Sequence, residues 1–247
     1  MKDLILIPTY NRPEILAICL ERLKAADLIE QHEIWIEKPD CKNATTSDEI
    51  YRVIDNSGLD IILISKPARP IYDNFYDLFK DAYQTEVELV YLMEDDILVT
   101  KDFFRWHRQA MRQFDPFMSI GVNCWTHSST PQSLNKVILS VKDYEQWGAC
   151  IRRYNLPLIE REHERVLEEV LHNQIIKNRL RIIFPDVPRA YNVGFYGADS
   201  CEAPLMGSLE ERINQAREKS ITKPGFWRPF KETEEWSGDL WIGDIRS

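Results

Sequence analysis

The sequence predicts an α/β fold in which a mainly parallel β-sheet is covered by helices on both faces. Short apolar runs, typical of buried strands, alternate with segments whose apolar residues recur at helical spacing. Polar segments follow three of these runs, as expected where ligand-binding loops leave the carboxyl ends of parallel strands. With 247 residues, of which 44% are hydrophobic, the chain is long enough for one large domain or two small ones.

The first half of the chain shows this alternation most clearly. The run "LILIP" ends at Pro8 and predicts a buried strand, and Pro13 is well placed as the first residue of the following helix. The same reasoning predicts buried strands over 33–37, 59–65 and 87–94, and helices over 50–54, 72–83 and 101–114.

The pattern loosens after Phe117. The predicted strands here are 119–125 and 135–141, followed by a tight turn at 144–149. A helix is expected over 156–178, and the runs 180–185 and 190–197 close the folded part. The apolar stripe of that helix is expected at Val166, Leu167, Val170, Leu171 and Ile175. We expect one folded unit over residues 1–199, with halves of about 1–100 and 101–199. The polar and then aromatic residues 200–247 are expected to form an irregular C-terminal extension that wraps the domain or acts as a lid.

Composition excludes several classes of protein. The net charge of −9 and the pI of about 5.2 disfavour long contacts with phosphate backbones. Five widely spaced cysteines without a CxxC pair disfavour a disulfide framework or a zinc ribbon, and they favour a reducing compartment. No signal peptide is recognisable, and no apolar run approaches the roughly 18 residues of a membrane span. These features predict a cytoplasmic protein.

Three adjacent carboxylates, Glu94, Asp95 and Asp96, follow the apolar run of the fourth predicted strand. Such charges repel one another, and Mg²⁺ or Mn²⁺ relieves the repulsion because hard cations prefer carboxylate oxygens. In an extended segment Glu94 and Asp96 point to one side and Asp95 to the other. We therefore expect one or two carboxylates on a metal ion and the others on sugar hydroxyls. The alternatives are a solvated acidic turn that caps the next helix, and an aspartyl-phosphate phosphatase, which normally places its Asp-x-Asp near the first strand.

Two stretches resemble a known family of enzymes. "LILIPTYNRPEILAICLERL" resembles the opening of nucleotide-sugar-dependent glycosyltransferases of the GT-A fold, which has a mixed, mainly parallel Rossmann-like sheet. "YLMEDDILVTKDFF" resembles the Glu-Asp-Asp segment of the N-acetylglucosaminyltransferase I family, where a Phe-Phe pair follows at this distance. Further on, "EQWGACI" resembles that family's Gly-Trp turn, and residues 168–189 align without gaps with a family segment in which Pro185 and Arg189 match.

The resemblance implies a metal-dependent hexosyl- or N-acetylhexosaminyltransferase. It would move a sugar from a nucleotide diphosphate sugar, expected to be a UDP-sugar, to an acceptor hydroxyl with inversion. Residues 1–100 would then bind the nucleotide and 101–199 the acceptor. Asp96 would hold Mn²⁺ or Mg²⁺. The donor or nucleotide would contact Pro8, Thr9, Arg12, Asp40, Glu94, Asp95 and Gly197, the last of these in the loop over the donor.

The catalytic base is expected at Glu168, where the family has an aspartate, with Glu169 as the next candidate. The alternative for both is a solvated, charged helix face. A glutamate at position 168 would reach further than the aspartate of the family, because its side chain is one methylene longer. Enzymes of the family from the secretory pathway carry a membrane anchor and stem, which this sequence lacks. Because the donor-loop residues also differ, the family's sugar specificity does not carry over.

Two other functions remain possible from the sequence. A nucleotidyltransferase shares this kind of sheet and a metal site, but it would need a Gly-rich loop after the first strand, and "IPTYNRPE" has no glycine. A non-catalytic module would bind a nucleotide sugar or glycan without turnover. The acceptor could be a glycan, a protein, a lipid-linked sugar or a nucleic-acid base, of which the acidic pI disfavours the last.

Overall fold

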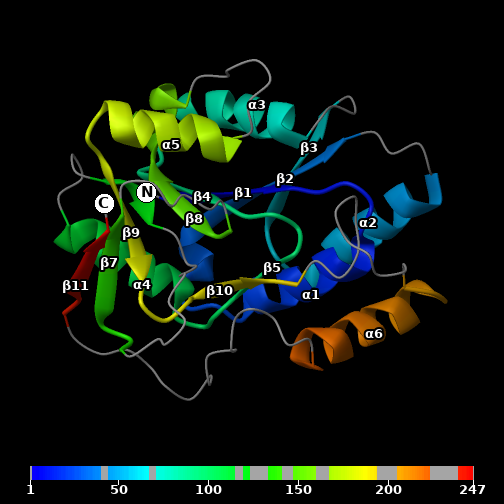
Figure 1. Cartoon of the computed structure of the whole chain (residues 1–247). Coiled ribbons are helices and arrows are strands. Elements are labelled where there is room, and N and C mark those ends of the chain that lie inside the picture. Colours follow the sequence, from blue (N-terminus) through cyan, green and yellow to red (C-terminus); the bar gives the residue numbers. More distant parts are fainter. Residues whose placement is uncertain are drawn as a thin grey trace.

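The computed structural model describes residues 2–39, 44–66, 71–114, 119–122, 133–140, 147–159, 167–193, 205–222 and 239–246. A large twisted sheet runs through the molecule, with helices above and below it (Figure 1). The expected α/β architecture with a mixed, mainly parallel sheet is confirmed.

The main sheet has nine strands in the order β11-β7-β9-β6-β8-β4-β1-β2-β3. The pairings of β4, β1, β2 and β3 are parallel, whereas β8 runs antiparallel to both of its neighbours. A separate two-stranded sheet pairs β5 with β10. The strands are β1 (Asp3–Pro8), β2 (His32–Pro39), β3 (Ile61–Lys66), β4 (Leu89–Leu92), β5 (Ile97–Val99), β6 (Ser119–Val122), β7 (Lys136–Ser140), β8 (Ala149–Arg152), β9 (Arg181–Pro185), β10 (Ala190–Asn192) and β11 (Trp241–Arg246).

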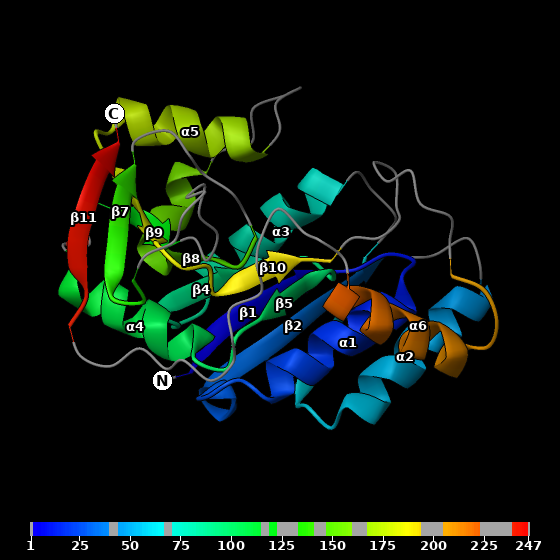
Figure 2. The same ribbon diagram turned by 60° about the horizontal axis from the view of Figure 1, so that its bottom comes forward.

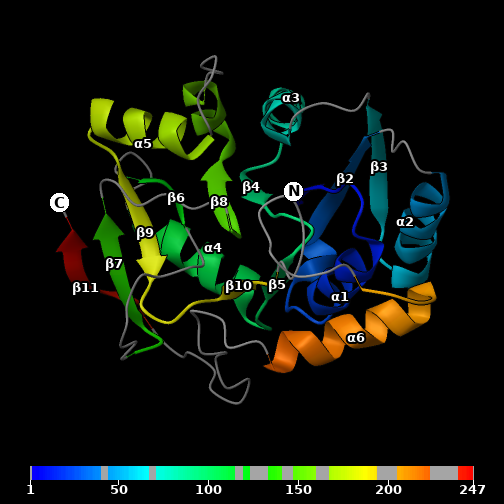
Figure 3. The same cartoon turned by 45° about the vertical axis from the view of Figure 1, so that its right-hand side comes forward.

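The sheet separates two hydrophobic cores. Alternate side chains of a strand face opposite sides, so Ile5 and Ile7 of β1 enter one core and Leu4 and Leu6 the other. Helices α1, α2 and α4 cover the first face, and α3 and α5 cover the second (Figure 3). The helices are α1 (Pro13–Lys24), α2 (Ala44–Ser57), α3 (Ile71–Tyr83), α4 (Phe103–Gln113), α5 (Leu167–Lys177) and α6 (Leu209–Thr222), with short 3₁₀ helices η1 (Ile29–Gln31) and η2 (Arg153–Leu158).

The third predicted strand is less buried than expected. β3 is the edge strand beside β2, and Ile62 is 46% exposed. A strand with a partner on only one side lacks the cover that a neighbouring strand provides. The apolar run 59–65 therefore predicted the strand correctly and its burial incorrectly.

The tight turn expected at 144–149 is described from Trp147 onward, and it leads into β8, a strand that the pattern did not predict. Gly148 has a φ of +68°, and a Cβ added there would lie 3.0 Å from the Phe103 ring and 3.1 Å from the Ala190 Cβ. Only glycine combines that backbone conformation with such close neighbours. The glycine lets β8 start directly beside β4.

The helix expected over 156–178 is not continuous in the described residues. η2 occupies its beginning and α5 its end, and residues 160–166, including Val166, lie outside the described residues. In α5 the predicted apolar stripe is buried at Val170, Leu171 and Ile175. The amphipathic period of α5 was therefore predicted correctly, but its start was not.

The described parts of the C-terminal extension are regular, which corrects the expectation of an irregular segment. α6 packs on α1, where Ala216 joins a small core with Ile15 and Ile18. At the opposite end of the molecule, β11 pairs in parallel with β7 and completes the sheet (Figure 2).

Candidate functional site

The carboxyl ends of β1 and β4 lie side by side because these strands pair in parallel. The pairing continues one residue beyond β4, where the Met93 amide donates to the Leu6 carbonyl at 3.0 Å. The chain then turns sharply, and the Ile97 amide donates to the Glu94 carbonyl at 3.2 Å. The acidic triplet therefore lies in a turn between β4 and β5. The expectation that an extended backbone would point Asp95 away from its neighbours is wrong for this reason.

The two aspartates of this turn meet the polar segment after β1. The Thr9 hydroxyl donates to Asp95 Oδ2 at 2.8 Å. The Arg12 guanidinium pairs with both carboxylates, donating from Nη2 to Asp95 and from Nη1 to Asp96 Oδ2 at 2.9 Å. The Asn192 amide donates to Asp96 Oδ1 at 3.2 Å. Each of the four carboxylate oxygens thus accepts a hydrogen bond.

Burial makes the electrostatics of this cluster unusual. The side chains of Asp95 and Asp96 are only 4% and 6% exposed, against 19% for Arg12. Burial raises the pKa of Asp96; the positive charge of Arg12 opposes this, the charge of Asp95 adds to it, and the pKa stays above its ordinary value. Burial lowers the pKa of Arg12, but the two carboxylates raise it by more, so the guanidinium stays charged. With both aspartates ionised, two negative charges face one positive charge.

Cys19 of α1 lies close enough to this cluster to sense its charges. Burial raises the pKa of the Cys19 thiol well above its usual value, and the charges of Asp96 and Asp95 raise it further. A thiol that stays protonated is a poor nucleophile. Cys19 is therefore a small buried side chain of the core and not a nucleophile.

Asn192 is the member of the cluster that sequence reasoning missed. It ends β10, which pairs antiparallel with β5 so that Asn192 stands opposite Ile97. The Val193 amide also donates to the Asp96 backbone carbonyl at 2.8 Å. The sequence analysis placed 190–197 at the end of the folded part without assigning a strand, and it contained no signal for the partner, because that pairing joins residues more than 90 positions apart.

Arg189, which matches the family segment in the sequence, stabilises the fold and lies outside the Asp95–Asp96 cluster. Its side chain is fully buried, and Nη1 donates to Asp102 Oδ2 at 3.0 Å while Nη2 donates to the Leu134 carbonyl at 3.1 Å. The Thr100 amide donates to the Arg189 carbonyl at 2.9 Å. These bonds hold the start of β10 against the end of β5, and so they support the placement of Asn192 on Asp96.

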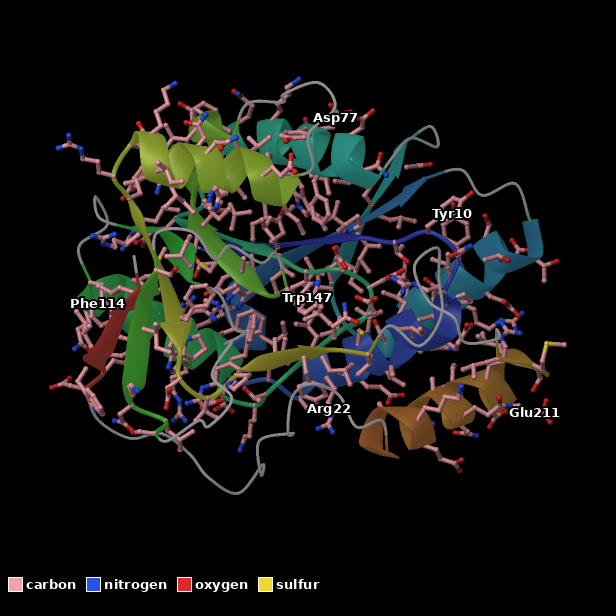
Figure 4. All side chains as sticks on the ribbon, viewed as in Figure 1. Tyr10, Arg22, Asp77, Phe114, Trp147 and Glu211 are labelled. Atoms are coloured by element: carbon pink, nitrogen blue, oxygen red, sulfur yellow. The ribbon has the colours of Figure 1, made fainter. Side chains whose placement is uncertain are left out.

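The other predicted site residues are placed as follows. Pro8 is the last residue of β1, and Glu94 is half-buried at the start of the turn. Asp40 and Gly197 lie outside the described residues, and Glu168 lies in α5 with its side chain outside them. Glu169 is exposed and makes no hydrogen bond or ion pair with other described residues. Tyr10, which was not predicted, is 45% exposed at the end of β1 beside Thr9 (Figure 4).

The chemistry of the acidic turn fits a hard divalent cation, because Glu94, Asp95 and Asp96 offer carboxylate oxygens. The described residues nevertheless contain no group of three His, Cys, Asp or Glu side chains arranged to hold a metal ion. The oxygen of Asp96 that faces Arg12 already accepts a charged hydrogen bond. A cation at Asp96 would therefore share an oxygen with the Arg12 guanidinium or the Asn192 amide, or displace one of them.

The fold places the chain among α/β proteins of the GT-A type, as its similarity to solved structures shows. A mannosyltransferase from Pyrobaculum calidifontis in complex with GDP-Man and Mn²⁺ superposes with a TM-score of 0.57 and 14% identity, over 76% of this chain and 57% of that one. S. aureus TarS, residues 1–349, superposes with a TM-score of 0.57 and 16% identity, over 78% of this chain and 61% of that one. The same TarS fragment in complex with UDP-GlcNAc gives a TM-score of 0.57 and 14% identity, over 90% of this chain and 67% of that one.

At these identities the similarity establishes the fold alone. This chain spans about three fifths of the length of the first two of these proteins. No protein-family model matches the sequence, and neither does any curated protein. Within the described residues, no helix has both the length and the apolar character needed to cross a membrane.

Proposed function

We propose that this protein is a glycosyltransferase that moves a sugar from a nucleotide diphosphate sugar to an acceptor hydroxyl. The observation that carries the proposal is the buried Asp95–Asp96 pair with Arg12, at the carboxyl edge where β1 and β4 end. Ligands of open α/β sheets bind at this edge. Proteins of the same fold have been solved with GDP-Man and with UDP-GlcNAc, which supports a nucleotide sugar as the donor.

The donor would lie across the ends of β1 and β4. Pro8 and Thr9 would face the nucleotide, and Arg12 and Asp40 would contact it. Glu94 and Asp95 would accept hydrogen bonds from sugar or ribose hydroxyls, because ionised carboxylates are acceptors only. Gly197 would belong to a loop over the donor. In this arrangement Thr9 keeps Asp95 oriented through the 2.8 Å hydrogen bond described above.

Asp96 would hold Mn²⁺ or Mg²⁺, and the Mn²⁺ of the mannosyltransferase complex supports this choice. When bound, the cation would offset the negative charge of the donor diphosphate. Arg12 would keep its positive charge near the diphosphate, because a guanidinium binds phosphate oxygens well. Asn192 keeps the other oxygen of Asp96 in place throughout. Arg12 is thus both a partner for Asp96 in the unliganded protein and a contact for the donor.

Glu168 would act as the general base that takes the proton from the acceptor hydroxyl, with Glu169 as the second candidate. With the base on the acceptor side, the acceptor oxygen would attack the anomeric carbon while the bond to the nucleotide diphosphate breaks, and the configuration of that carbon would be inverted. The resemblance to the N-acetylglucosaminyltransferase I family favours a UDP-sugar with a hexosyl or N-acetylhexosaminyl group. The acceptor would be a glycan, a protein, a lipid-linked sugar or a nucleic-acid base. This list and the proposed cytoplasmic location both rest on the sequence.

A donor screen tests the proposal. Purified protein is incubated with UDP- and GDP-sugars, with Mn²⁺, Mg²⁺ or EDTA, and release of free nucleotide is measured. We expect slow hydrolysis of one donor that needs a divalent cation. Asp96→Ala should lower this hydrolysis at least about 100-fold, because the charge of the diphosphate would no longer be offset. Arg12→Gln should weaken donor binding about tenfold or more, since one charge-assisted hydrogen bond to phosphate is lost.

Asp60→Ala serves as the matched control, because Asp60 is an exposed aspartate outside this cluster, and it should leave the hydrolysis unchanged. Donor binding without release of nucleotide would instead identify a non-catalytic binding module. If none of the nucleotide sugars binds with or without metal, the proposed function is wrong. Glu168→Gln, assayed with an acceptor once one is found, separates transfer from hydrolysis.

A further inference from the structure

A second polar site lies at the opposite edge of the sheet, where β1 and β4 begin. It is a cavity of about 210 Å³. Its lining residues are Asp3, Gln31, Glu88, Leu89, Arg108, Met111, Arg112 and Arg152. Asp3 is the first residue of β1 and Pro8 the last, so at about 3.3 Å per residue the cavity is roughly 17 Å from the Asp95–Asp96 pair. This cavity is therefore separate from the proposed donor site.

Three arginines line the cavity, but only one of them is fully paired. Arg108 donates to Asp3 Oδ2 from Nε at 3.2 Å and from Nη2 at 3.0 Å, and its Nη1 donates to the Gln31 side chain. Asp3 also accepts the Leu89 amide at 3.2 Å through its other oxygen. All three nitrogens of the Arg108 guanidinium donate hydrogen bonds, and both oxygens of Asp3 accept them, so neither side chain needs a further partner.

The other two arginines have donors to spare. Arg152, which is buried, donates from Nη1 to Glu88 at 2.8 Å and from Nη2 to the Met111 carbonyl at 2.5 Å. Its Nε is also buried, yet it has no hydrogen-bond partner among the described residues. Arg112 is exposed at the last turn of α4 and makes no ion pair or hydrogen bond with any residue that the structure describes. Arg112 therefore has donors available to an anion, and Arg152 would offer its Nη1 once the exposed Glu88 leaves it.

The charges of the residues that line the cavity also favour an anion as its ligand. Three arginines face two carboxylates, so the cavity has one net positive charge in a chain whose net charge is −9. The Glu88 side chain is 67% exposed, and an exposed ion pair of this kind contributes little stability. Glu88 can therefore leave Arg152 for solvent at small cost when a better acceptor arrives.

We propose that this cavity binds a small oxoanion, a phosphate or carboxylate group, between Arg112 and Arg152. Arginine is the side chain best suited to such groups, because its fixed donors match two oxygens at once. At about 30 Å³ per water molecule, the volume of the cavity corresponds to roughly seven waters, which is ample for a phosphate group. The anion would accept from Arg112 and from the Arg152 Nη1, where it would replace Glu88.

Binding of inorganic anions tests this site directly. Sodium phosphate, sulfate and acetate are titrated into the full-length protein at constant ionic strength, with chloride as the balancing salt, and calorimetry and thermal unfolding are followed. We expect saturable binding of at least one oxoanion. Arg112→Gln should weaken it about tenfold or more, since an exposed arginine can be replaced without harm to folding. Glu88→Gln should strengthen it, because a competing carboxylate is removed.

Two control variants separate this site from the rest of the molecule. Arg52→Gln removes an exposed arginine on α2 and should leave the affinity unchanged. Arg12→Gln alters the proposed donor site and should also leave it unchanged, so the result does not depend on the proposed function. Binding of acetate as well as phosphate would show a general oxoanion site, and binding of phosphate and sulfate alone a site for tetrahedral anions. The proposal is overturned if no oxoanion saturates, or if the Arg12 variant loses binding and the Arg112 variant keeps it.

Discussion

Two buried arginine–aspartate groups in this protein differ in ways that indicate different tasks. Arg189 pairs with a single aspartate, Asp102, and the two side chains are 0% and 7% exposed. Arg12 pairs with two aspartates at once and is itself 19% exposed. The first group is neutral and sealed from solvent. The second has an excess of negative charge and an opening to solvent.

The comparison shows how a structural ion pair differs from a candidate site made of the same residue types. A buried charge is tolerated when an opposite charge pairs with it, and Asp102 gives Arg189 such a partner at 3.0 Å. At the Arg12 group two carboxylates share one guanidinium among the described residues. Burial raises the pKa of Asp96 and the charge of Asp95 adds to this, and perturbed pKa values of this kind are frequent at functional sites.

The largest expected effect is at the sealed pair. Arg189→Ala leaves Asp102 as an uncompensated buried charge and should lower the free energy of unfolding by about 3–5 kcal/mol. Urea denaturation measures this change. The double variant Arg189→Met with Asp102→Asn should recover much of the loss, because no unpaired charge remains. If Arg189→Ala lowers the free energy of unfolding by less than about 1 kcal/mol, the Arg189–Asp102 pair contributes no more than an exposed ion pair, and the proposed difference between the two groups is wrong.

A smaller effect is expected at Thr9. Thr9→Val removes the hydroxyl that donates to Asp95 at 2.8 Å, and the buried oxygen then loses one donor. We expect the free energy of unfolding to fall by about 1–2 kcal/mol. Thr9→Ser keeps the hydroxyl and serves as the matched control in the same denaturation experiment. Equal effects of the two variants would mean that the methyl group matters and the hydrogen bond does not.

The smallest effect on stability, with the opposite sign, is expected at Asp96. Burial raises the pKa of this carboxyl, so between its ordinary pKa of 3.8 and the raised value the folded state binds more protons than the unfolded state. The free energy of unfolding therefore falls as pH rises through this window, and the deficit persists at neutral pH. Asp96→Asn cannot ionise and should have a slightly higher Tm than the wild type at pH 7.

The pH dependence provides the control for this last prediction. The difference in Tm between Asp96→Asn and the wild type should disappear well below the ordinary pKa of 3.8, where the Asp96 carboxyl is neutral in both the folded and the unfolded state. A difference that is independent of pH would show that lost hydrogen bonds, and not ionisation, control the stability. An asparagine that stabilises the protein and abolishes donor hydrolysis would show that the aspartate is retained for function.

Much of the fold could be predicted from the sequence because its elements carry their own periodicity. The alternation of Leu4 and Leu6 with Ile5 and Ile7 lies within a fully apolar run, which is typical of a strand buried on both faces. β8 was missed because it starts at the end of the segment 144–149, which the sequence analysis took as a tight turn. α6 was missed because Arg212, held by Glu14 and Glu49, anchors a helix with few apolar residues.

The candidate site was predicted in part for a similar reason. Parallel strands bring their carboxyl ends together, so the approach of Thr9 and Arg12 to Asp95 and Asp96 follows from strand order alone. The direct pairing of Arg12 with both aspartates depends on the turn after Met93, which sequence reasoning took as extended. The contact of Asn192 depends on a pairing between distant strands, for which the sequence contains no local signal.

The excess negative charge of Asp95 and Asp96 over Arg12, at the carboxyl ends of β1 and β4, also affects how fast a nucleotide associates with the protein. A ligand diphosphate that approaches Asp95 and Asp96 without a cation meets charge of its own sign, so its encounter with the protein is slowed by repulsion. Added salt screens that repulsion over about 8–10 Å and should speed the encounter of the bare nucleotide. A nucleotide that arrives already complexed with a divalent cation avoids most of the barrier, so the two partners would reach the protein fastest together.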